Sequence, residues 1–523
     1  MSLTNKQKFF KSTAVVSVFT MISRIFGYIR DAAIFIFISN SNGALDAFFV
    51  AFRIPNFFRR IFGEGALSTA YVPVLSDYKN NSEGKDVKEF INASITYLSI
   101  ILLVISIIGV AITPILIYFI APGFVYAESE QYELSYNLLR ITFPYMFFIC
   151  LTAVSSSILN CYEKFSIPAF TPAILNIILI LSVLFFSESF SEPVYALAWG
   201  LIFAGIVQLI FVLYPLIKMG LFPKINFNKN HPGIKKIKEL MIPVIFGSSV
   251  TQVNLIFDTI IASFLITGSI SWLYMSDRFI ELPLALFGIS IATVLLPKLS
   301  EYYNKKDYKS YNTTINWGLK LGILISIPTC IGLVLLSEPI LITLLQYREF
   351  SANDVSMTSL SLIAFAFGLP GMIGAKILIT NYYSRKDTSY PVRAAVIAVI
   401  TNFVMNIVFV IYLTSIKFEG VHVGLALATS VSAYINFFLL FKNAIKTKIL
   451  IIDKSIIQIL AKTILASIIM TLFVLYFDLN ANSWVNLELL DRVSKLLMII
   501  SLAAIVYFIL LYALKISPKK IKI

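Results

Sequence analysis

The sequence has few charged residues for its length. Only 13% of the 523 residues are Asp, Glu, Lys or Arg, whereas 58% are hydrophobic, and the mean hydropathy is +0.85. A soluble domain usually carries about twice that share of charge, so a soluble protein is excluded. The hydrophobic residues form continuous runs without alternation, each long enough to cross a ~30 Å hydrocarbon core. They indicate an all-α, polytopic membrane protein and exclude a β-barrel.

The sequence also contains few cysteines and histidines and lacks the common sequence motifs of enzyme active sites. The three cysteines, Cys150, Cys161 and Cys330, lie in or beside apolar runs, where they are expected to be inert. The two histidines, His231 and His422, belong to no metal-ligand spacing. There is no phosphate-binding glycine loop, nucleophile elbow or metalloprotease helix. The sequence therefore predicts that the protein is neither an enzyme nor an ATP-driven pump.

Apolar runs divide the chain into about fourteen predicted spans, the first a retained helix and not a cleaved signal. Most Lys and Arg lie in alternate connections and near both ends. This distribution predicts that the basic loops and both termini are cytoplasmic. It also explains the net charge of +14 without binding of nucleic acid. The predicted spans are 12–39, 45–75, 91–120, 133–161, 169–188, 193–217, 238–267, 271–299, 313–346, 355–383, 390–415, 421–443, 455–477 and 494–515.

Two segments six spans apart resemble each other. Arg53-Ile54-Pro55 precedes Val72-Pro73-Val74-Leu75-Ser76-Asp77-Tyr78, and Glu281-Leu282-Pro283 precedes Leu296-Pro297-Lys298-Leu299-Ser300-Glu301-Tyr302. Both copies end in a lysine-bearing loop, so they predict two parallel, pseudo-symmetric six-helix lobes, as in many transporters. Chance similarity between apolar sequences is the alternative. The predicted parts are an N-terminal lobe (1–220), a C-terminal lobe (221–448) and two further helices (449–523).

Charged residues gather in the spans 12–39, 45–75 and 271–299. A charge inside the membrane costs at least a few kcal/mol, so it normally faces a cavity or a partner. Arginine is always ionised and grips phosphate oxygens bidentately, so arginines from both lobes around one cavity suit a phosphate-bearing substrate. Neutralising pairs between helices are the structural alternative, and snorkelling is the alternative for Arg59 and Arg60. The candidate residues are Arg24, Arg30, Asp31, Asp46, Arg53, Arg59, Glu64, Asp277, Arg278 and Glu281.

Four other polar residues form a candidate cation site. Asp258 lies in the span 238–267, Asn402 and Asn406 share a helix face, and Thr429 lies in the next span. A carboxylate with amide and hydroxyl oxygens suits a small hard cation such as Na⁺. Hydrogen bonding between helices is the alternative, because Asn and Thr supply it routinely in membranes.

Three motifs resemble a known family. They are Ser23-Arg24-Ile25-Phe26-Gly27-Tyr28-Ile29-Arg30-Asp31, Asp46-Ala47-Phe48-Phe49-Val50-Ala51-Phe52-Arg53-Ile54-Pro55-Asn56 and Arg59-Arg60-Ile61-Phe62-Gly63-Glu64-Gly65-Ala66. Together with Ser271-Trp272 and Asp277-Arg278, they resemble the MurJ (MviN) family of lipid II flippases. This family belongs to the multidrug/oligosaccharidyl-lipid/polysaccharide exporter superfamily. The resemblance runs over nearly the whole chain.

The resemblance implies a fourteen-helix flippase of the bacterial cytoplasmic (inner) membrane. Such a protein moves undecaprenyl-pyrophosphoryl disaccharide-pentapeptide to the outer leaflet for peptidoglycan assembly, and its last two helices form a groove for the lipid tail. The family's cavity arginines carry over to Arg24, Arg30, Arg59 and Arg278, and lysine is common at the position of Arg53. Some members have a sodium site that resembles the set Asp258, Asn402, Asn406 and Thr429. In that site a carboxylate can occupy the position that is Asn406 here. The associated acidic positions are Asp31, Asp46, Glu64, Asp277 and Glu281.

The partners expected from this resemblance are lipid II and membrane lipids, and contact with the peptidoglycan synthesis machinery stays open. No cofactor is expected, and coupling to Na⁺ or to the membrane potential is left open. A cation-coupled drug exporter or a polysaccharide-lipid flippase of the same superfamily is the alternative within transport. A drug exporter should have fewer cavity arginines. A scaffold for peptidoglycan enzymes is the alternative outside transport, and it should tolerate neutralisation of these charges.

Overall fold

The computed structural model describes residues 3–40, 42–60, 67–81, 84–228 and 231–516, and the side chains of 3–14 and 246–251 lie outside this description. Within these ranges the regular structure is helical and contains no β-strand. The chain forms two compact units, residues 1–270 and 271–523. The all-α fold predicted from the sequence is confirmed. The three-part division at residues 220 and 448 stays a prediction.

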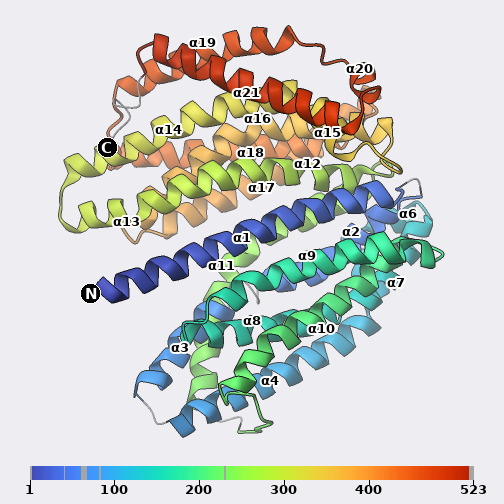
Figure 1. The fold of residues 1–523 in the computed structure, drawn as a ribbon, viewed down its shortest axis with the longest axis vertical. Helices are drawn as coiled ribbons and strands as arrows, with labels where there is room; N and C mark the ends of the chain where they lie inside the picture. Colours follow the sequence, from blue (N-terminus) through green and yellow to red (C-terminus); the bar gives the residue numbers. More distant parts are fainter. Residues whose placement is uncertain (1–2, 41, 61–66, 82–83, 229–230, 517–523) are drawn as a thin grey trace. The chain divides into compact units, whose positions relative to one another are not determined.

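In the first unit, each predicted span corresponds to one helix or to consecutive helices (Figure 1). The first two spans become α1 (Leu3–Phe37) and the pair α2 (Ala44–Phe58) and α3 (Leu67–Asn81). The remaining elements are α4 (Gly84–Ala111), α5 (Thr113–Ile120), α6 (Pro122–Tyr126), α7 (Glu130–Thr142), α8 (Tyr145–Cys161), α9 (Ser166–Phe186), η2 (Ser187–Ser189), α10 (Val194–Lys218) and α11 (Pro232–Ala262).

The second unit repeats this correspondence. Its elements are α12 (Ser269–Pro283), the π-helix η3 (Leu284–Ile289), α13 (Ser290–Asn304), α14 (Tyr308–Leu335), α15 (Ser337–Leu345), α16 (Ala352–Tyr383), α17 (Ser389–Ser415), α18 (Val423–Lys446), α19 (Ser455–Leu475), α20 (Ala481–Val485) and α21 (Leu489–Ala513). Eleven helical segments of the described chain are long and apolar enough to cross a membrane. With α1, the pair α2–α3 and α11, they account for the fourteen predicted spans.

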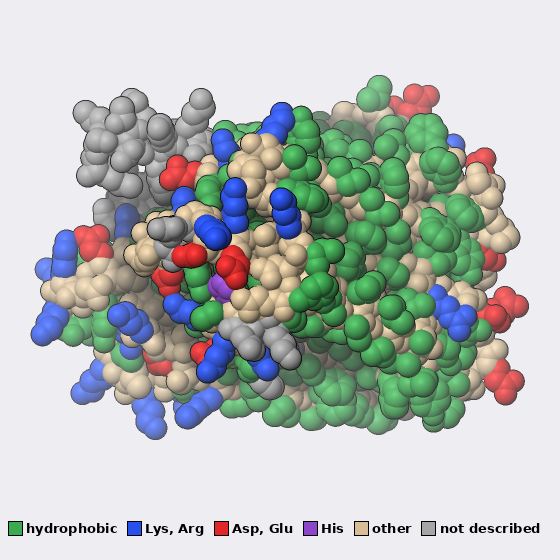
Figure 2. Space-filling model, turned by 90° about the horizontal axis from the view of Figure 1, so that it is seen from below, with side chains coloured by type: hydrophobic (Ala, Val, Ile, Leu, Met, Phe, Trp, Pro, Cys, Tyr) green, Lys and Arg blue, Asp and Glu red, His purple; other side chains and the backbone are tan. Residues whose placement is uncertain are grey.

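Large apolar side chains face outward on most spans, as expected for a surface in contact with lipid. Ile107, Phe119, Phe203 and Phe508 are all more than half exposed. Figure 2 shows one face on which hydrophobic side chains form a broad band. Most Lys and Arg on this face lie at one end of the band, together with some Asp and Glu, whereas Asp and Glu predominate among the few charged side chains at the other end. This distribution is typical of a multi-pass membrane protein with a basic and an acidic side.

Within the first unit, α1 packs along α9, and α9 packs along α10 (Figure 1). Phe35 of α1 also stacks on Phe49 of α2, with ring centroids 5.7 Å apart. In the second unit, α16 packs between α14 and α18. A Cβ on Gly368 of α16 would stand 2.5 Å from Oγ of Ser430 on α18, so glycine permits this close approach.

The proposed repeat has a counterpart in local structure. Pro55 lies near the end of α2, and residues 59–60 then form a π-type turn. Pro283 ends α12, and the π-helix η3 follows at once. Proline lacks the N–H of a regular helical hydrogen bond, which explains why both helices change form there. The interruptions divide each of these two predicted spans into a charged first half and a second half that ends on the basic side.

Candidate functional site

A buried ion pair anchors the charges of α1. Arg30 and Asp31 are 9% and 0% exposed, and Nε of Arg30 donates to Oδ1 of Asp31 at 2.9 Å. Nη1 of Arg30 donates to Oδ1 of Asn176 on α9 at 3.0 Å, and Nδ2 of Asn176 donates to the carbonyl of Ser23 at 2.9 Å. Asn176 therefore joins α1 to α9 and satisfies a guanidinium that would otherwise be expensive to bury. The neutralising pair weighed as the structural alternative is present here.

Arg24 has a different environment, although it lies on the same helix. Its six-residue separation from Arg30 corresponds to about 9 Å along α1. The Arg24 side chain is exposed, as are those of Ile25 and Ile29 on the same helix. Its guanidinium is therefore accessible to an anionic ligand without first breaking a buried pair.

Asp46 lies in the first turn of α2 and binds the turn that follows α11. The carboxylate is 2% exposed and accepts a hydrogen bond from the backbone N–H of Gly268 at 2.7 Å. Nδ2 of Asn40 also approaches it at 3.4 Å. Gly268 has a φ of +99°, which a residue with a Cβ rarely adopts. Asp46 thus holds the turn after α11 against the start of α2, and in this state its carboxylate acts within the fold.

The remaining charges of α2 lie near its proline. Arg53 and Arg59 are half-buried, and Arg60 shares the π-type turn with Arg59. Nε and Nη2 of Arg59 donate to Oδ1 of Asn56 at 3.1 and 2.9 Å, so the amide one turn earlier orients this guanidinium. Glu64 lies outside the described residues.

In the second unit, the candidate charges occupy the last turns of α12. Asp277, Arg278 and Glu281 are all half-buried. Nη1 of Arg278 lies 2.7 Å from Oε2 of Glu281, and the two side chains are 27% and 40% exposed. The pair is therefore partly exposed, and it lies directly before Pro283 and η3. Each unit thus places arginines beside the interruption of one helix, where ligand sites of transporters often occur.

The candidate cation ligands fall into two groups. Nδ2 of Asn402 donates to Oγ1 of Thr429 at 3.1 Å, and Nδ2 of Asn406 donates to Oδ1 of Asn402 at 3.0 Å. Asp258 belongs to the first unit, on α11, where Nδ2 of Asn254 lies 3.4 Å from its carboxylate. The amide chain between α17 and α18 matches the hydrogen-bonding alternative. Among the described residues, no three His, Cys, Asp or Glu side chains gather as metal ligands. Sodium binding stays a prediction.

The sequence did not single out three amides that hold the charged residues: Asn40, Asn56 and Asn176. Asn176 had a signal, because a primary amide within the strongly apolar helix α9 needs a partner inside the membrane. Which partner it meets depends on how α9 packs against α1, and the sequence alone does not specify this packing.

Comparison with known proteins connects this arrangement to one family. The family described as "Lipid II flippase MurJ" matches residues 40–495. A probable lipid II flippase MurJ of Vibrio cholerae is 37% identical over 529 aligned residues, which cover 99% of each chain. The lipid II flippase MurJ of Burkholderia cenocepacia is 34% identical, with 97% of each chain covered. The chain belongs to the MurJ family. The resemblance recognised from the motifs of the first two spans is confirmed.

Solved structures agree with this assignment. A structure described as lipid II flippase MurJ in an inward closed conformation has a TM-score of 0.78 and 30% identity, covering 95% of this chain and 98% of that one. An inward-facing multidrug transporter of the MATE family and MOP superfamily has a TM-score of 0.64 at 14% identity. The MATE likeness shows a shared fold only. MurJ membership and these shared folds confirm the polytopic α-helical architecture.

Proposed function

We propose that the protein is a lipid II flippase, which moves undecaprenyl-pyrophosphoryl disaccharide-pentapeptide from the cytoplasmic to the outer leaflet by alternating access. The observation that carries the proposal is the relationship to named lipid II flippases over nearly the whole chain. The distribution of charge supports it. Residues 12–60 contain five arginines and two aspartates, a net charge of +3 within a membrane-spanning region. A pyrophosphate is the part of lipid II that such an excess would bind.

We assign direct contact with the pyrophosphate to Arg24, Arg53, Arg59 and Arg278. Arg24 is exposed and the other three are half-buried, so substrate can reach them without unpacking a helix. We assign Arg30 to positioning α1, because Asp31 and Asn176 hold its guanidinium in a buried network. The accessible carboxylate of Glu281 would serve as the partner of Arg278 while substrate is absent.

We further propose that α19 and α21 receive the polyprenyl tail. The two helices lie side by side, and α19 packs on α14 (Figure 1). The hydroxyl of Tyr507 on α21 donates to the carbonyl of Leu324 on α14 at 2.7 Å. Arg492 of α21 donates to the carbonyl of Ile342 on α15 at 3.2 Å. These contacts support the proposal that α19 and α21 move together with the rest of the second unit. We place the protein in the inner membrane with both termini cytoplasmic, and we leave the driving gradient as Na⁺ or the membrane potential.

Complementation separates this proposal from its rivals. Arg24→Ala and Arg278→Ala should each fail to support growth after depletion of the native protein, although immunoblots show normal amounts in the membrane. Lys164→Ala, which removes an exposed lysine outside the arginine clusters, should complement fully. Full complementation by both arginine variants would contradict a pyrophosphate-binding role and favour a scaffold. Efflux of cationic drugs that persists in both variants would favour an exporter.

A further inference from the structure

The connection between α10 and α11 crosses α4 as an extended strap, which we define as residues 221–228. Its backbone is held by side chains of α4. Oδ1 of Asn92 accepts from the N–H of Lys224 at 2.8 Å, and Oγ1 of Thr96 accepts from the N–H of Asn226 at 3.0 Å. The hydroxyl of Tyr97 donates to the carbonyl of Phe227 at 2.7 Å. These bonds give the strap a defined course without a regular element of its own.

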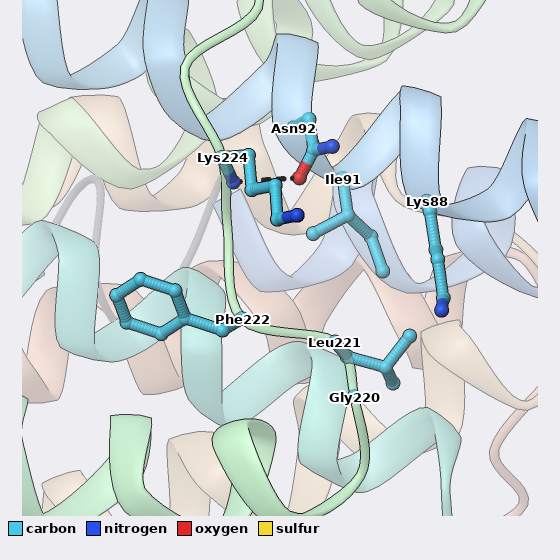
Figure 3. A pocket seen from close by; sticks show the side chains of 7 residues that line it. All are labelled: Lys88, Ile91, Asn92, Gly220, Leu221, Phe222 and Lys224. Carbon is cyan, nitrogen blue, oxygen red and sulfur yellow. Dashed lines mark hydrogen bonds between the residues drawn. The ribbon is translucent and has the colours of Figure 1, made fainter.

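Between the strap and α4 lies a pocket of about 290 Å³ (Figure 3). Gly220 follows α10 and has a φ of +66°, and Nζ of Lys88 comes within 4.0 Å of the place that a Cβ there would occupy. Figure 3 shows the side chains of Lys224 and Lys88 on either side of Ile91 and Leu221. The lining residues are Lys88, Ile91, Asn92, Gly220, Leu221, Phe222 and Lys224.

The pocket has two cations and no neutralising acid. Within the described part of the chain, no carboxylate forms an ion pair with Lys88 or Lys224. The neighbouring Glu89 instead accepts a hydrogen bond from Nδ2 of Asn228 at 3.1 Å. Two ammonium groups beside one cavity favour an anionic occupant. Ile91 and Leu221 lie between them, so the occupant should also have an apolar part.

The strap exposes apolar side chains at the pocket and just beyond it. Phe222, which lines the pocket, is 50% exposed, and Ile225 and Phe227 farther along the strap are 80% and 69% exposed. The pocket also lies where two membrane spans end, because Lys88 precedes the apolar part of α4 and Gly220 follows α10. Aromatic and basic side chains at such a level are typical of the lipid headgroup region.

We propose that this pocket binds the phosphate of an anionic phospholipid headgroup, with Lys88 and Lys224 as its cationic ligands. The acyl chains then lie against Phe222 and its apolar neighbours. A soluble anion would use the lysines but gain nothing from Phe222 or from the exposed Ile225 and Phe227 farther along the strap, so the apolar strap favours a lipid. None of its lining residues belongs to α1, α2 or α12 or is one of the arginines assigned to lipid II.

The test uses the whole protein purified in detergent and titrated with phosphatidylglycerol, phosphatidylcholine or glycerol phosphate. Native mass spectrometry measures the fraction with bound ligand. The variant Lys88→Gln/Lys224→Gln is compared with Lys85→Gln/Lys164→Gln, which removes two exposed lysines of the same unit that do not line the pocket. The wild type and the control should bind phosphatidylglycerol alike, and the pocket variant should bind it roughly tenfold more weakly. Phosphatidylcholine binding should change little.

Three results would overturn the proposal. Equal losses in the pocket and control variants would mean that surface charge alone attracts the lipid. Displacement of phosphatidylglycerol by glycerol phosphate at equal concentration would identify a soluble-anion site. Unchanged binding in the pocket variant would remove the two lysines as ligands. Phe222→Ser keeps both lysines and should weaken binding of phosphatidylglycerol without affecting glycerol phosphate, so a folded single variant tests the lipid assignment independently.

Discussion

Arg24 and Arg30 show how two identical side chains on one helix can have different tasks. Arg24 is exposed, whereas Arg30 is enclosed by Asp31 and by Asn176 of another helix. Both were predicted from the sequence as charged residues within a span, because intramembrane arginine is rare and normally functional. Their difference could not be predicted, since it depends on which face of α1 meets α9.

Asn176 provides a test of the buried network. Replacing it with Leu keeps the volume similar but removes the acceptor for Arg30 and the donor to Ser23. A buried charged group that loses a partner costs about 1–3 kcal/mol, so the thermal midpoint of the protein in detergent should fall. The control is Asn353→Leu, at an exposed position in the first turn of α16, which should leave the midpoint nearly unchanged. Equal midpoints for wild type and Asn176→Leu would show that the network adds no stability.

At the level of elements, hydropathy predicted all the spans, but it did not reveal their interruptions. The span 271–299 is divided into α12, η3 and α13, and the span 313–346 into α14 and α15. Pro283 accounts for the break in the first case, because proline lacks the backbone N–H of a helical hydrogen bond. The π-helix after it could not be predicted, because its form depends on how the displaced turn packs. The hydrogen bonds among Asn402, Asn406 and Thr429 could not be predicted either, because they depend on how α17 packs on α18.

The attachment of α19 to α14 yields a prediction about pH. Asp453, in the connection before α19, accepts from Nζ of Lys320 at 2.6 Å and from the N–H of Ser455 at 3.0 Å. The Lys320 hydrogen bond, helped by Ser455, lowers the pKa of this carboxyl from 3.8 to about 2. A carboxyl with a lowered pKa stabilises the fold fully above its ordinary pKa, and this stabilisation is lost as the pH falls toward the lowered value.

Asp453→Asn should therefore have a lower thermal midpoint than the wild type from pH 7 down to about pH 4, and the difference should shrink between pH 4 and pH 2. The effect should be modest because the Asp453 side chain is 46% exposed. Asp491→Asn, at an exposed position in the first turn of α21, serves as the matched control. A difference that stays constant down to pH 2 would mean that the charge of Asp453 does not stabilise the attachment.

For the whole molecule, composition alone predicted a polytopic helical protein, and the motifs of the first two spans predicted its family. Both predictions are confirmed by the helical structure and by relatives that match nearly the entire chain. The pocket between the strap and α4, with Lys224 of the strap and Lys88 of α4 beside it, could not be predicted, because the sequence indicates only basic loops there. The packing of residues 221–228 on α4 turns that loop into a pocket.

The central claim is that this protein carries lipid II across the membrane. The most direct measurement is the accessibility of lipid II to an externally added enzyme that cleaves its headgroup, in intact cells depleted of the protein and supplied with wild type or Arg24→Ala. Wild type should restore external cleavage, whereas depleted cells and those with Arg24→Ala should keep lipid II protected in the cytoplasmic leaflet. Undiminished cleavage in depleted cells, with lipid II still being synthesised, would contradict the account.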